Sequence, residues 1–260
     1  MHARFNLDPQ QENWSEYLSI GQDIHRRNKA IIEQDLDKFK NADDVLQAKD
    51  IIENWFPKID ADIFLSHSHK DEDLIIGLAG WLKTTFGLKS FIDSEVWGYA
   101  DNLLKAIDDK YCKNISKETY DYSLRNRSTS HVHMMLSTAL TEMIDRCECI
   151  IFVNTQNSFI PVDYLNGEGH TESPWIYSEI AITRMIRQRT PKEHRPVPTM
   201  DSINASVESL SESRNLRISY PAGLFHLTQL SLKDLNEWEL AENSRKSNYP
   251  LDSLYKMKRK

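Results

Sequence analysis

The stretch ADIFLSHSHKDEDLIIGLAGWLKTTFGLKSFID, residues 61 to 93, decides the fold. It contains a short apolar run, Ile63 to Leu65, which is too short for a helix and rich in strand-forming residues. Apolar residues then recur at the spacing of one helix face, and Lys89 to Asp93 predicts a second strand. A strand, a helix and a strand in so little sequence predict a parallel unit with a right-handed crossover.

The helix inside this unit has start and stop signals of its own. Ser68 with Asp71 three residues later gives an S-x-x-D start, and Gly87 is placed to end the helix. In open parallel sheets, ligands bind beyond the carboxyl ends of the strands. These ends are polar here, at residues 66 to 69 and at residues 93 to 95, so we expect the chemistry at this edge.

Composition narrows the class of protein. A chain of 260 residues is long enough to bury a core without disulfides, and buried thiols explain Cys147 and Cys149 better than a bridge or a metal does. Such cysteine usage suits a reducing cytoplasm. The net charge of −7 argues against nucleic-acid binding, and no apolar run approaches the length of a membrane span. We therefore expect a cytoplasmic protein with neither a membrane nor a nucleic acid as partner.

The chain divides into a predicted helical extension and a sheet domain. Residues 10 to 56 carry apolar side chains at helical spacing, which predicts an N-terminal helical extension over 1–57 and a sheet domain over 58–260. Two polar or turn-rich stretches, near 110–130 and 154–171, predict insertions in that domain. We expect the N-terminal helices to pack on the sheet domain or on a second subunit.

Further elements follow the second strand. We expect a loop over Asp93 to Gly98 and then a helix that begins near Leu103. A strong amphipathic helix is predicted from about His131 to Arg146. The uninterrupted apolar run CIIFV, residues 149 to 153, is typical of a strand that is buried on both faces. Short strands are plausible over 216–220 and 225–230, and Ser231 is a candidate cap for a last helix.

The segment ESPWIYSEI, residues 172 to 180, brings a carboxylate toward the strand ends. Ser173 is a typical N-cap, and Pro174 is a typical first helical residue. Trp175 and Glu179 are four residues apart and lie on one helix face. A helix that follows a parallel strand begins at the edge where the strands end. We therefore expect both side chains to face the polar strand ends described above.

Four segments in the right order resemble Toll/interleukin-1 receptor (TIR) domains, particularly the bacterial ones. DIFLSHSHKDEDL (62–74) resembles their first strand and helix, and FIDSEVWGYADNLLKAID (91–108) resembles their second strand, BB loop and second helix. CIIFVNTQNS (149–158) and SPWIYSEI (173–180) resemble the third strand and the next helix, where catalytic members carry W-x-x-x-E. The resemblance covers about residues 60 to 190 and implies a flavodoxin-like, doubly wound parallel sheet.

The resemblance also implies an activity. Catalytic TIR domains cleave the bond between nicotinamide and ribose in NAD, which implies that Glu179 is the catalytic residue. A fixed carboxylate stabilises the positive charge that develops on the ribosyl centre as nicotinamide leaves. NAD is then a substrate, and no cofactor is implied. The products are nicotinamide with ADP-ribose or with a cyclic ADP-ribose. The substrate-binding candidates are Ser66, His67, Lys70, Asp93, Trp97 and Trp175.

The chain is similar to stand-alone TIR proteins of Thoeris-type antiphage systems. That similarity implies a homo-oligomer and a separately encoded effector that the product activates. We expect residues 10 to 56 to take part in self-association. The BB-loop segment lacks the proline that is common in receptor and adaptor members, and the two predicted insertions are larger than usual in the family.

Other functions stay open at the level of the sequence. A non-catalytic interaction module would leave Glu179 dispensable and make BB-loop residues such as Trp97 essential. A nucleoside deoxyribosyltransferase-like enzyme shares a related α/β plan and also uses a glutamate. The pattern H-x-H-x-D-x-D at 67–73 resembles a metal site, but its aspartates stand where helix-starting acids are common, so we predict no metal. The absence of a G-x-G-x-x-G or Walker loop after either strand disfavours a dehydrogenase or an NTPase.

Overall fold

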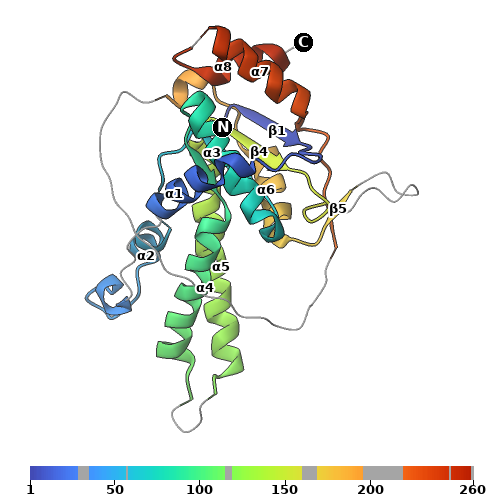
Figure 1. Cartoon of the computed structure of the whole chain (residues 1–260). Helices are drawn as coiled ribbons and strands as arrows, with labels where there is room; N and C mark the ends of the chain where they lie inside the picture. Colours follow the sequence, from blue (N-terminus) through green and yellow to red (C-terminus); the bar gives the residue numbers. More distant parts are fainter. Residues whose placement is uncertain are drawn as a thin grey trace.

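A five-stranded parallel sheet lies at the centre of the protein (Figure 1). The computed structural model describes residues 1–28, 35–56, 58–114, 119–159, 169–195, 219–245 and 247–258, without the side chains of residues 95–97. The strands are β1 (Ala3–Leu7), β2 (Ile63–Ser66), β3 (Ser90–Ile92), β4 (Cys149–Val153) and β7 (Thr228–Leu230). Their order is β3-β2-β4-β1-β7, and every pair is parallel. The fold is flavodoxin-like or Rossmann-like, as the sequence predicted.

The first strand corrects the predicted N-terminal extension. The segment 1–57 was expected to be helical and outside the sheet, but β1 lies inside the sheet between β4 and β7. In spatial order the sheet matches the flavodoxin arrangement 2-1-3-4-5, with β1 in the fourth position. The sequence ARFNL alternates apolar and polar residues as a strand does, but over only five positions, and the prediction of a helical extension did not include this strand. The segment is a buried strand because Phe5 and Leu7 pack against helices that are distant in the sequence.

Helices account for most of the remaining chain. They are α1 (Leu18–Asn28), α2 (Ala48–Trp55), α3 (Glu72–Phe86), α4 (Ser94–Ile107), α5 (Tyr122–Arg146), α6 (Pro174–Met185), α7 (Leu232–Ser244) and α8 (Pro250–Lys258). Shorter elements are the 3₁₀ turns η1 (Ser15–Tyr17), η2 (Leu36–Phe39), η3 (His69–Asp71) and η5 (Pro191–Glu193), the π-helical turn η4 (Asp108–Cys112), and the hairpin β5 (His170–Thr171) and β6 (Tyr220–Pro221). The predicted helices over 10–56 are therefore α1 and α2 with two 3₁₀ turns, and residues 29–34 lie outside the described chain. Among the described residues, no helix is both long and apolar enough to cross a bilayer.

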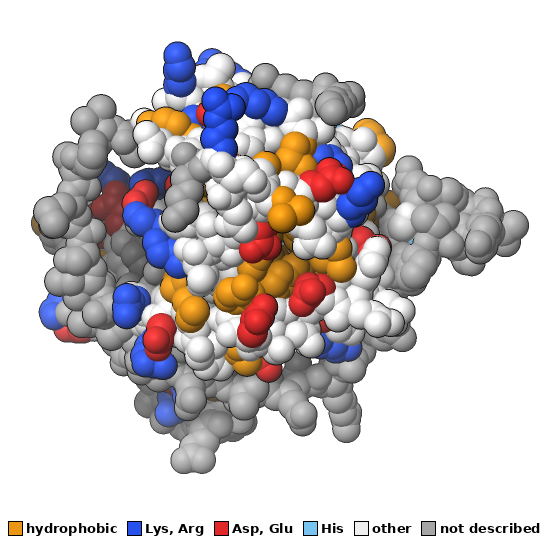
Figure 2. All heavy atoms as spheres, turned by 45° about the horizontal axis from the view of Figure 1, so that its top comes forward, with side chains coloured by type: hydrophobic (Ala, Val, Ile, Leu, Met, Phe, Trp, Pro, Cys, Tyr) orange, Lys and Arg blue, Asp and Glu red, His pale blue; other side chains and the backbone are white. Residues whose placement is uncertain are grey.

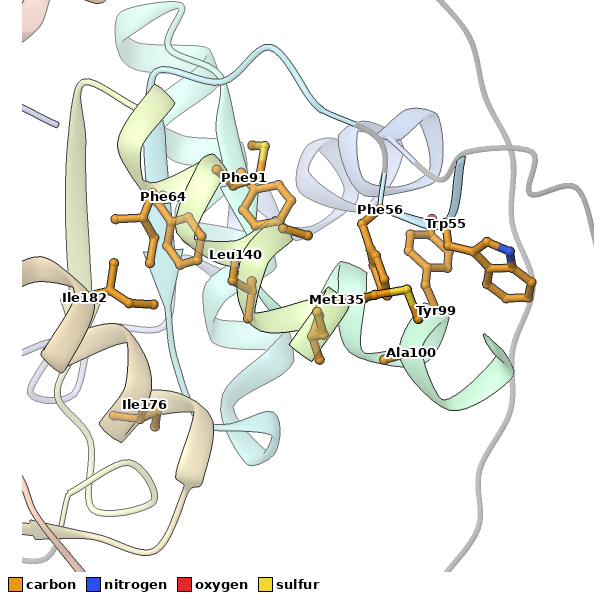
Figure 3. Packing of buried hydrophobic residues seen from close by; sticks show 14 of the residues in the cluster. Trp55, Phe56, Phe64, Phe91, Tyr99, Ala100, Met135, Leu140, Ile176 and Ile182 are labelled. Atoms are coloured by element: carbon orange, nitrogen blue, oxygen red, sulfur yellow. The ribbon is translucent and has the colours of Figure 1, made fainter. Parts of the chain in front are cut away.

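Successive side chains of each strand point to opposite faces of the sheet, and they belong to two hydrophobic clusters, one on each face. Phe64 of β2 points into a cluster that α2, α4, α5 and α6 complete, and its ring centroid lies 5.1 Å from that of Phe91 (Figure 3). Ile63 and Leu65 point to the other face, where α3, α7 and α8 complete a second cluster and α1 packs along α3. The result is a three-layer α/β/α arrangement, which explains why the central strands are apolar throughout.

Several predicted helix boundaries are confirmed. Gly87 adopts a left-handed conformation with φ of 71° and ends α3. Ser173 caps α6 by accepting a hydrogen bond from the amide of Ile176 at 3.2 Å, with Pro174 as the first helical residue. Ser231 forms a capping box at the start of α7. The S-x-x-D start of α3 is wrong in its detail, because neither side chain there caps the helix.

The predicted loop after β3 and the predicted insertion near 110–130 are largely helical. Helix α4 begins at Ser94, directly after β3, and α5 begins at Tyr122 rather than near His131. The side chain of Asp121 caps α5 by accepting a hydrogen bond from the amide of Leu124 at 2.9 Å. Together α4, η4 and α5 form a helical hairpin that projects from the sheet (Figure 1). Residues 160–168 of the other predicted insertion lie outside the described chain.

Glycines allow α1 and η1 to approach α3 closely, which gives a test of this packing. A Cβ atom on Gly80 would overlap the carbonyl oxygen of Tyr17 and lie 2.9 Å from the amide nitrogen of Gly21. We expect Gly80→Ala to lower the free energy of unfolding by about 1–3 kcal/mol, because main-chain atoms have to move apart. Gly98→Ala in α4 is the control, since no heavy atom lies within 4 Å of its added Cβ.

The control variant should be stabilised by about 0.5–1 kcal/mol, because alanine favours a helix over glycine. Urea unfolding of both variants measures the difference. A Gly80→Ala protein that unfolds at the same urea concentration as the wild type would show that α1 does not pack on α3 as described.

Candidate active site

The sheet has a topological switch point between β2 and β4. From β2 the chain moves to β3 on one side, and it then returns to β4 on the other side of β2. Ligand sites of open α/β sheets lie beyond the carboxyl ends of the strands at such a point. Here four polar side chains meet that are fully buried: Ser66, His67, Asp93 and Glu179.

Glu179 reaches the end of β2 because of where α6 begins. The Ser173 cap fixes the first turn of α6 at this edge, and Glu179 follows in the second turn. The hydroxyl of Ser66 donates a hydrogen bond to Oε2 of Glu179 at 2.5 Å. The structure thus brings together the glutamate and the strand end that the sequence predicted to face each other.

A second contact joins the ends of β2 and β3. Nδ1 of His67 lies 2.5 Å from Oδ1 of Asp93, and the main-chain amide of His67 donates to Oδ2 of Asp93 at 3.4 Å. Burial by itself lowers the pKa of His67, but the negative charge of Asp93 and its hydrogen bond outweigh burial, so the pKa is raised. The protonated histidine and the aspartate therefore form a buried ion pair.

The carboxyl of Glu179 has a strongly shifted pKa. Burial raises this pKa well above 4.5, and the negative charge of Asp93 raises it further, whereas the hydrogen bond from Ser66 acts in the opposite direction. In this closed arrangement the carboxyl group therefore favours its neutral form. A buried carboxyl group with a strongly shifted pKa is a candidate for a functional role.

Beyond the facing atoms of the His67–Asp93 pair, two further buried atoms of the cluster lack hydrogen-bond partners. Oε1 of Glu179 and Nε2 of His67 are buried, and no other described residue bonds to them. An unsatisfied buried polar atom costs about 1–3 kcal/mol, and such atoms in a folded protein need an explanation. A ligand that offers hydroxyl groups or oxyanion oxygens would satisfy both.

The raised pKa of Glu179 predicts how stability depends on pH. A group with a raised folded pKa stabilises the protein below its unfolded pKa, and this contribution is lost as pH rises through the folded pKa. We expect the wild type to lose stability as the pH rises from about 4.5, the ordinary value for a glutamate. Glu179→Gln removes the titrating group, so the variant should gain stability relative to the wild type at pH 8 but not at pH 4.5. Thermal unfolding at both values measures this, and parallel curves would contradict the neutral carboxyl.

The other predicted binding residues, Lys70, Trp97 and Trp175, lie on three different elements. Lys70 lies on η3 and is exposed. Trp97 lies in α4 with its side chain outside the described atoms. Trp175 is half-buried against the cluster of Phe64, and its ring meets that of His133 of α5 edge-on, with centroids 5.6 Å apart. Of the six candidates, Ser66 bonds to the glutamate, His67 and Asp93 pair with each other, and Trp175 packs on α5.

Residues that the sequence reasoning missed tie the loop after β4 to the turn after β2. Asp71 accepts a hydrogen bond from Oγ1 of Thr155 and another from Nδ2 of Asn157, each at 2.6 Å. Asp71 was interpreted only as a helix-starting acid. The signal that could have shown more is the polar run NTQNS, which directly follows a fully buried strand.

Glu179 does not line either of two cavities that the described residues form. One, of about 720 Å³, lies between α2 and α5 and has largely apolar walls that include Ile51 and Met135. The other, of about 220 Å³, lies beside β1. Because Glu179 has no exposed surface, a ligand reaches its carboxyl group only after neighbouring groups move. The described arrangement is therefore a closed form of the site.

Comparisons of the chain with protein-family models, with curated proteins and with solved structures find no match.

Proposed function

We propose that this protein is a TIR-like NAD glycohydrolase in which Glu179 is the catalytic carboxylate. One observation carries the proposal: the hydrogen bond between Ser66 and Glu179 at the switch point of the sheet. It joins the first strand-end motif of the TIR resemblance to the W-x-x-x-E helix, although the two residues are 113 positions apart. His67 and Asp93 supply further polar groups at the same place.

The chemistry follows from the charges that change during cleavage. NAD carries a positive nicotinamide ring, and departure of neutral nicotinamide leaves positive charge on the ribosyl carbon. When the site opens, water reaches Glu179 and removes the main cause of its raised pKa, so the carboxyl group loses its proton and stabilises this charge. Addition of water to the ribosyl carbon yields ADP-ribose and one proton. Attack by a group of the same molecule yields a cyclic product instead.

The neighbouring ion pair has a separate role in this proposal. Asp93 holds His67 in its protonated form, and the free Nε2 then donates a hydrogen bond to a ribose or phosphate oxygen of the substrate. Ser66 holds the glutamate side chain in place before the substrate enters. These groups position NAD, while the reacting centre lies against Glu179.

The proposal extends to the setting of the enzyme. It acts in the cytoplasm as a homo-oligomer, and its product activates a separately encoded effector in defence against phage. Residues 10 to 56 include exposed apolar side chains, Ile20 and Val45, which support a role in self-association. Figure 2, in which the top of Figure 1 is turned forward, shows apolar side chains exposed among acidic ones.

The test is to incubate the purified chain with NAD and to follow free nicotinamide by chromatography. The second product is identified by its mass, because a cyclic ADP-ribose is lighter than ADP-ribose by one water. A parallel reaction offers a 2′-deoxynucleoside and a free base. Turnover of the deoxynucleoside without NAD would assign the chain to deoxyribosyltransferase-like enzymes, and turnover of neither would favour the interaction module.

A further inference from the structure

The cavity of about 220 Å³ lies at the amino ends of strands β1 and β7, whereas Glu179 lies at the carboxyl ends of the strands. Its walls include Ala3 and Arg4 at the start of β1 and Thr228 at the start of β7, whereas Ser66 stands at the carboxyl end of β2. Strand β7 pairs with β1 only from Phe5 onward. Before that residue β1 has no strand partner on this side in the described chain, and the cavity lies in the resulting space.

Arg4 provides a cation in this cavity without a matching anion. Its guanidinium is half-buried, and Nη2 donates one hydrogen bond to the main-chain oxygen of Ile186 at 3.1 Å. No carboxylate of the described residues forms an ion pair with it, and burial is the only resolved influence on its pKa, which is lowered. Charged groups removed from water are normally paired, so an unpaired arginine beside a cavity indicates a missing counter-ion.

The other titratable groups that line the cavity leave the charge of Arg4 unmatched. The pKa of His226, which lines it, is lowered to about 4 by burial and then by the charges of Arg184 and Arg4. Lys258 also lines the cavity, and its charge is matched by Asp234 at 3.0 Å. None of the described residues that line the cavity is acidic. Arg4 is thus a cation of the cavity wall without a counter-charge among the described residues, and the free energy cost of its burial falls when an anion enters.

We propose that this cavity binds a phosphate group, with the guanidinium of Arg4 as its principal partner. The planar fork of donors in a guanidinium matches the oxygens of phosphate. A cavity of about 220 Å³ accommodates such a group with a few waters, but sites for drug-sized ligands begin near ~300 Å³, so a whole dinucleotide does not fit. The ring of Tyr255 already packs against those of His2 and Phe5, which leaves it unavailable to stack on a base. The site therefore takes inorganic phosphate, or the terminal phosphate of a nucleotide whose base lies outside.

The test is calorimetric titration of the full chain with sodium phosphate, at constant ionic strength in a buffer free of other oxyanions. We expect saturable binding of one phosphate per chain, which Arg4→Gln weakens at least about tenfold, the loss of one charge-assisted hydrogen bond. Arg184→Gln is the matched control: it removes a nearby cation that does not line the cavity, so the dissociation constant should change little. Titration with AMP distinguishes the two sources, because tighter binding than phosphate indicates a nucleotide.

Two further variants keep the result interpretable. Glu179→Gln should bind phosphate as the wild type does, which separates this site from the proposed NAD chemistry. Arg4→Lys keeps the charge without the fork, and it should bind with intermediate affinity even if Arg4→Gln fails to fold. Binding that does not saturate in the millimolar range, or that is equal in the wild type and the folded Arg4 variants, would overturn the proposal.

Discussion

Replacement of Glu179 by glutamine should reduce the rate of nicotinamide release from NAD by about 10²–10⁴-fold, the range for loss of one essential catalytic group. Glutamine has nearly the same shape and its amide oxygen can still accept the hydrogen bond from Ser66. It cannot carry the negative charge that stabilises the ribosyl centre. The variant should therefore fold and bind NAD but fail to cleave it, so that kcat falls much more than KM changes.

The matched control for this experiment is Asp73→Asn. Asp73 is an exposed acid in the first turn of α3, at the same edge of the sheet, and its removal changes the net charge of the protein equally. The control should release nicotinamide at close to the wild-type rate. Equal release by the wild type and the Glu179 variant would show that this glutamate is not catalytic.

Replacement of Asp93 by asparagine should destabilise the fold by about 3–5 kcal/mol near pH 5.5, the cost of leaving a buried charge without its partner. The raised pKa of His67 sets the sign of the pH dependence. The pair stabilises the protein below the ordinary histidine pKa of 6.5, and this stabilisation is lost as pH rises through the folded pKa. The loss caused by Asp93→Asn should therefore shrink at pH 8.5. Urea unfolding at the two pH values measures the difference.

A double-mutant cycle separates this pair from other effects of the substitution. If His67 and Asp93 stabilise each other, His67→Gln with Asp93→Asn should cost much less than the sum of the single changes. Additive losses at pH 5.5 would contradict the ion pair.

Loss of the negative charge at position 93 also removes one cause of the raised pKa of Glu179, so the pH profile of NAD cleavage should move to lower pH.

Much of the fold around residues 61 to 93 could be predicted, because local signals and burial agree there. The strand Ile63–Ser66 is apolar until its last residue, and Gly87 supplies the left-handed residue that ends α3. Strand β1 was missed although Arg4 and Asn6 alternate with its apolar residues, because this strand signal spans only five positions. Its burial is decided by pairing with β4 and β7, which are distant in sequence.

The helical hairpin of α4 and α5 shows another limit of local reasoning. The polar stretch at the start of α5 is typical of a loop, but most of its polar side chains lie on exposed faces of a helix. Ser128 is buried there and donates a hydrogen bond to Asp108, which also accepts one from Arg125 at 2.7 Å. These contacts bridge two elements, so neither segment alone predicts them.

The candidate site was predictable where topology alone places residues. Strand ends and the start of α6 share one edge of the sheet, which brings Ser66 and Glu179 together. The pairing of His67 with Asp93 depends on side-chain geometry at two strand ends, and the sequence indicated only that both were polar. Trp175 shares a helix face with Glu179, but its ring meets that of His133 of α5 edge-on, a contact between two elements that neither segment alone predicts.

The most direct test of the central claim is a crystal structure of the Glu179→Gln variant with NAD bound. We expect the nicotinamide-bearing ribose within hydrogen-bond distance of residue 179, beyond the carboxyl ends of β2 and β3, with His67 Nε2 close to a substrate oxygen. NAD bound instead in the apolar cavity between α2 and α5, or a site at residue 179 that remains closed at saturating NAD, would contradict the claim.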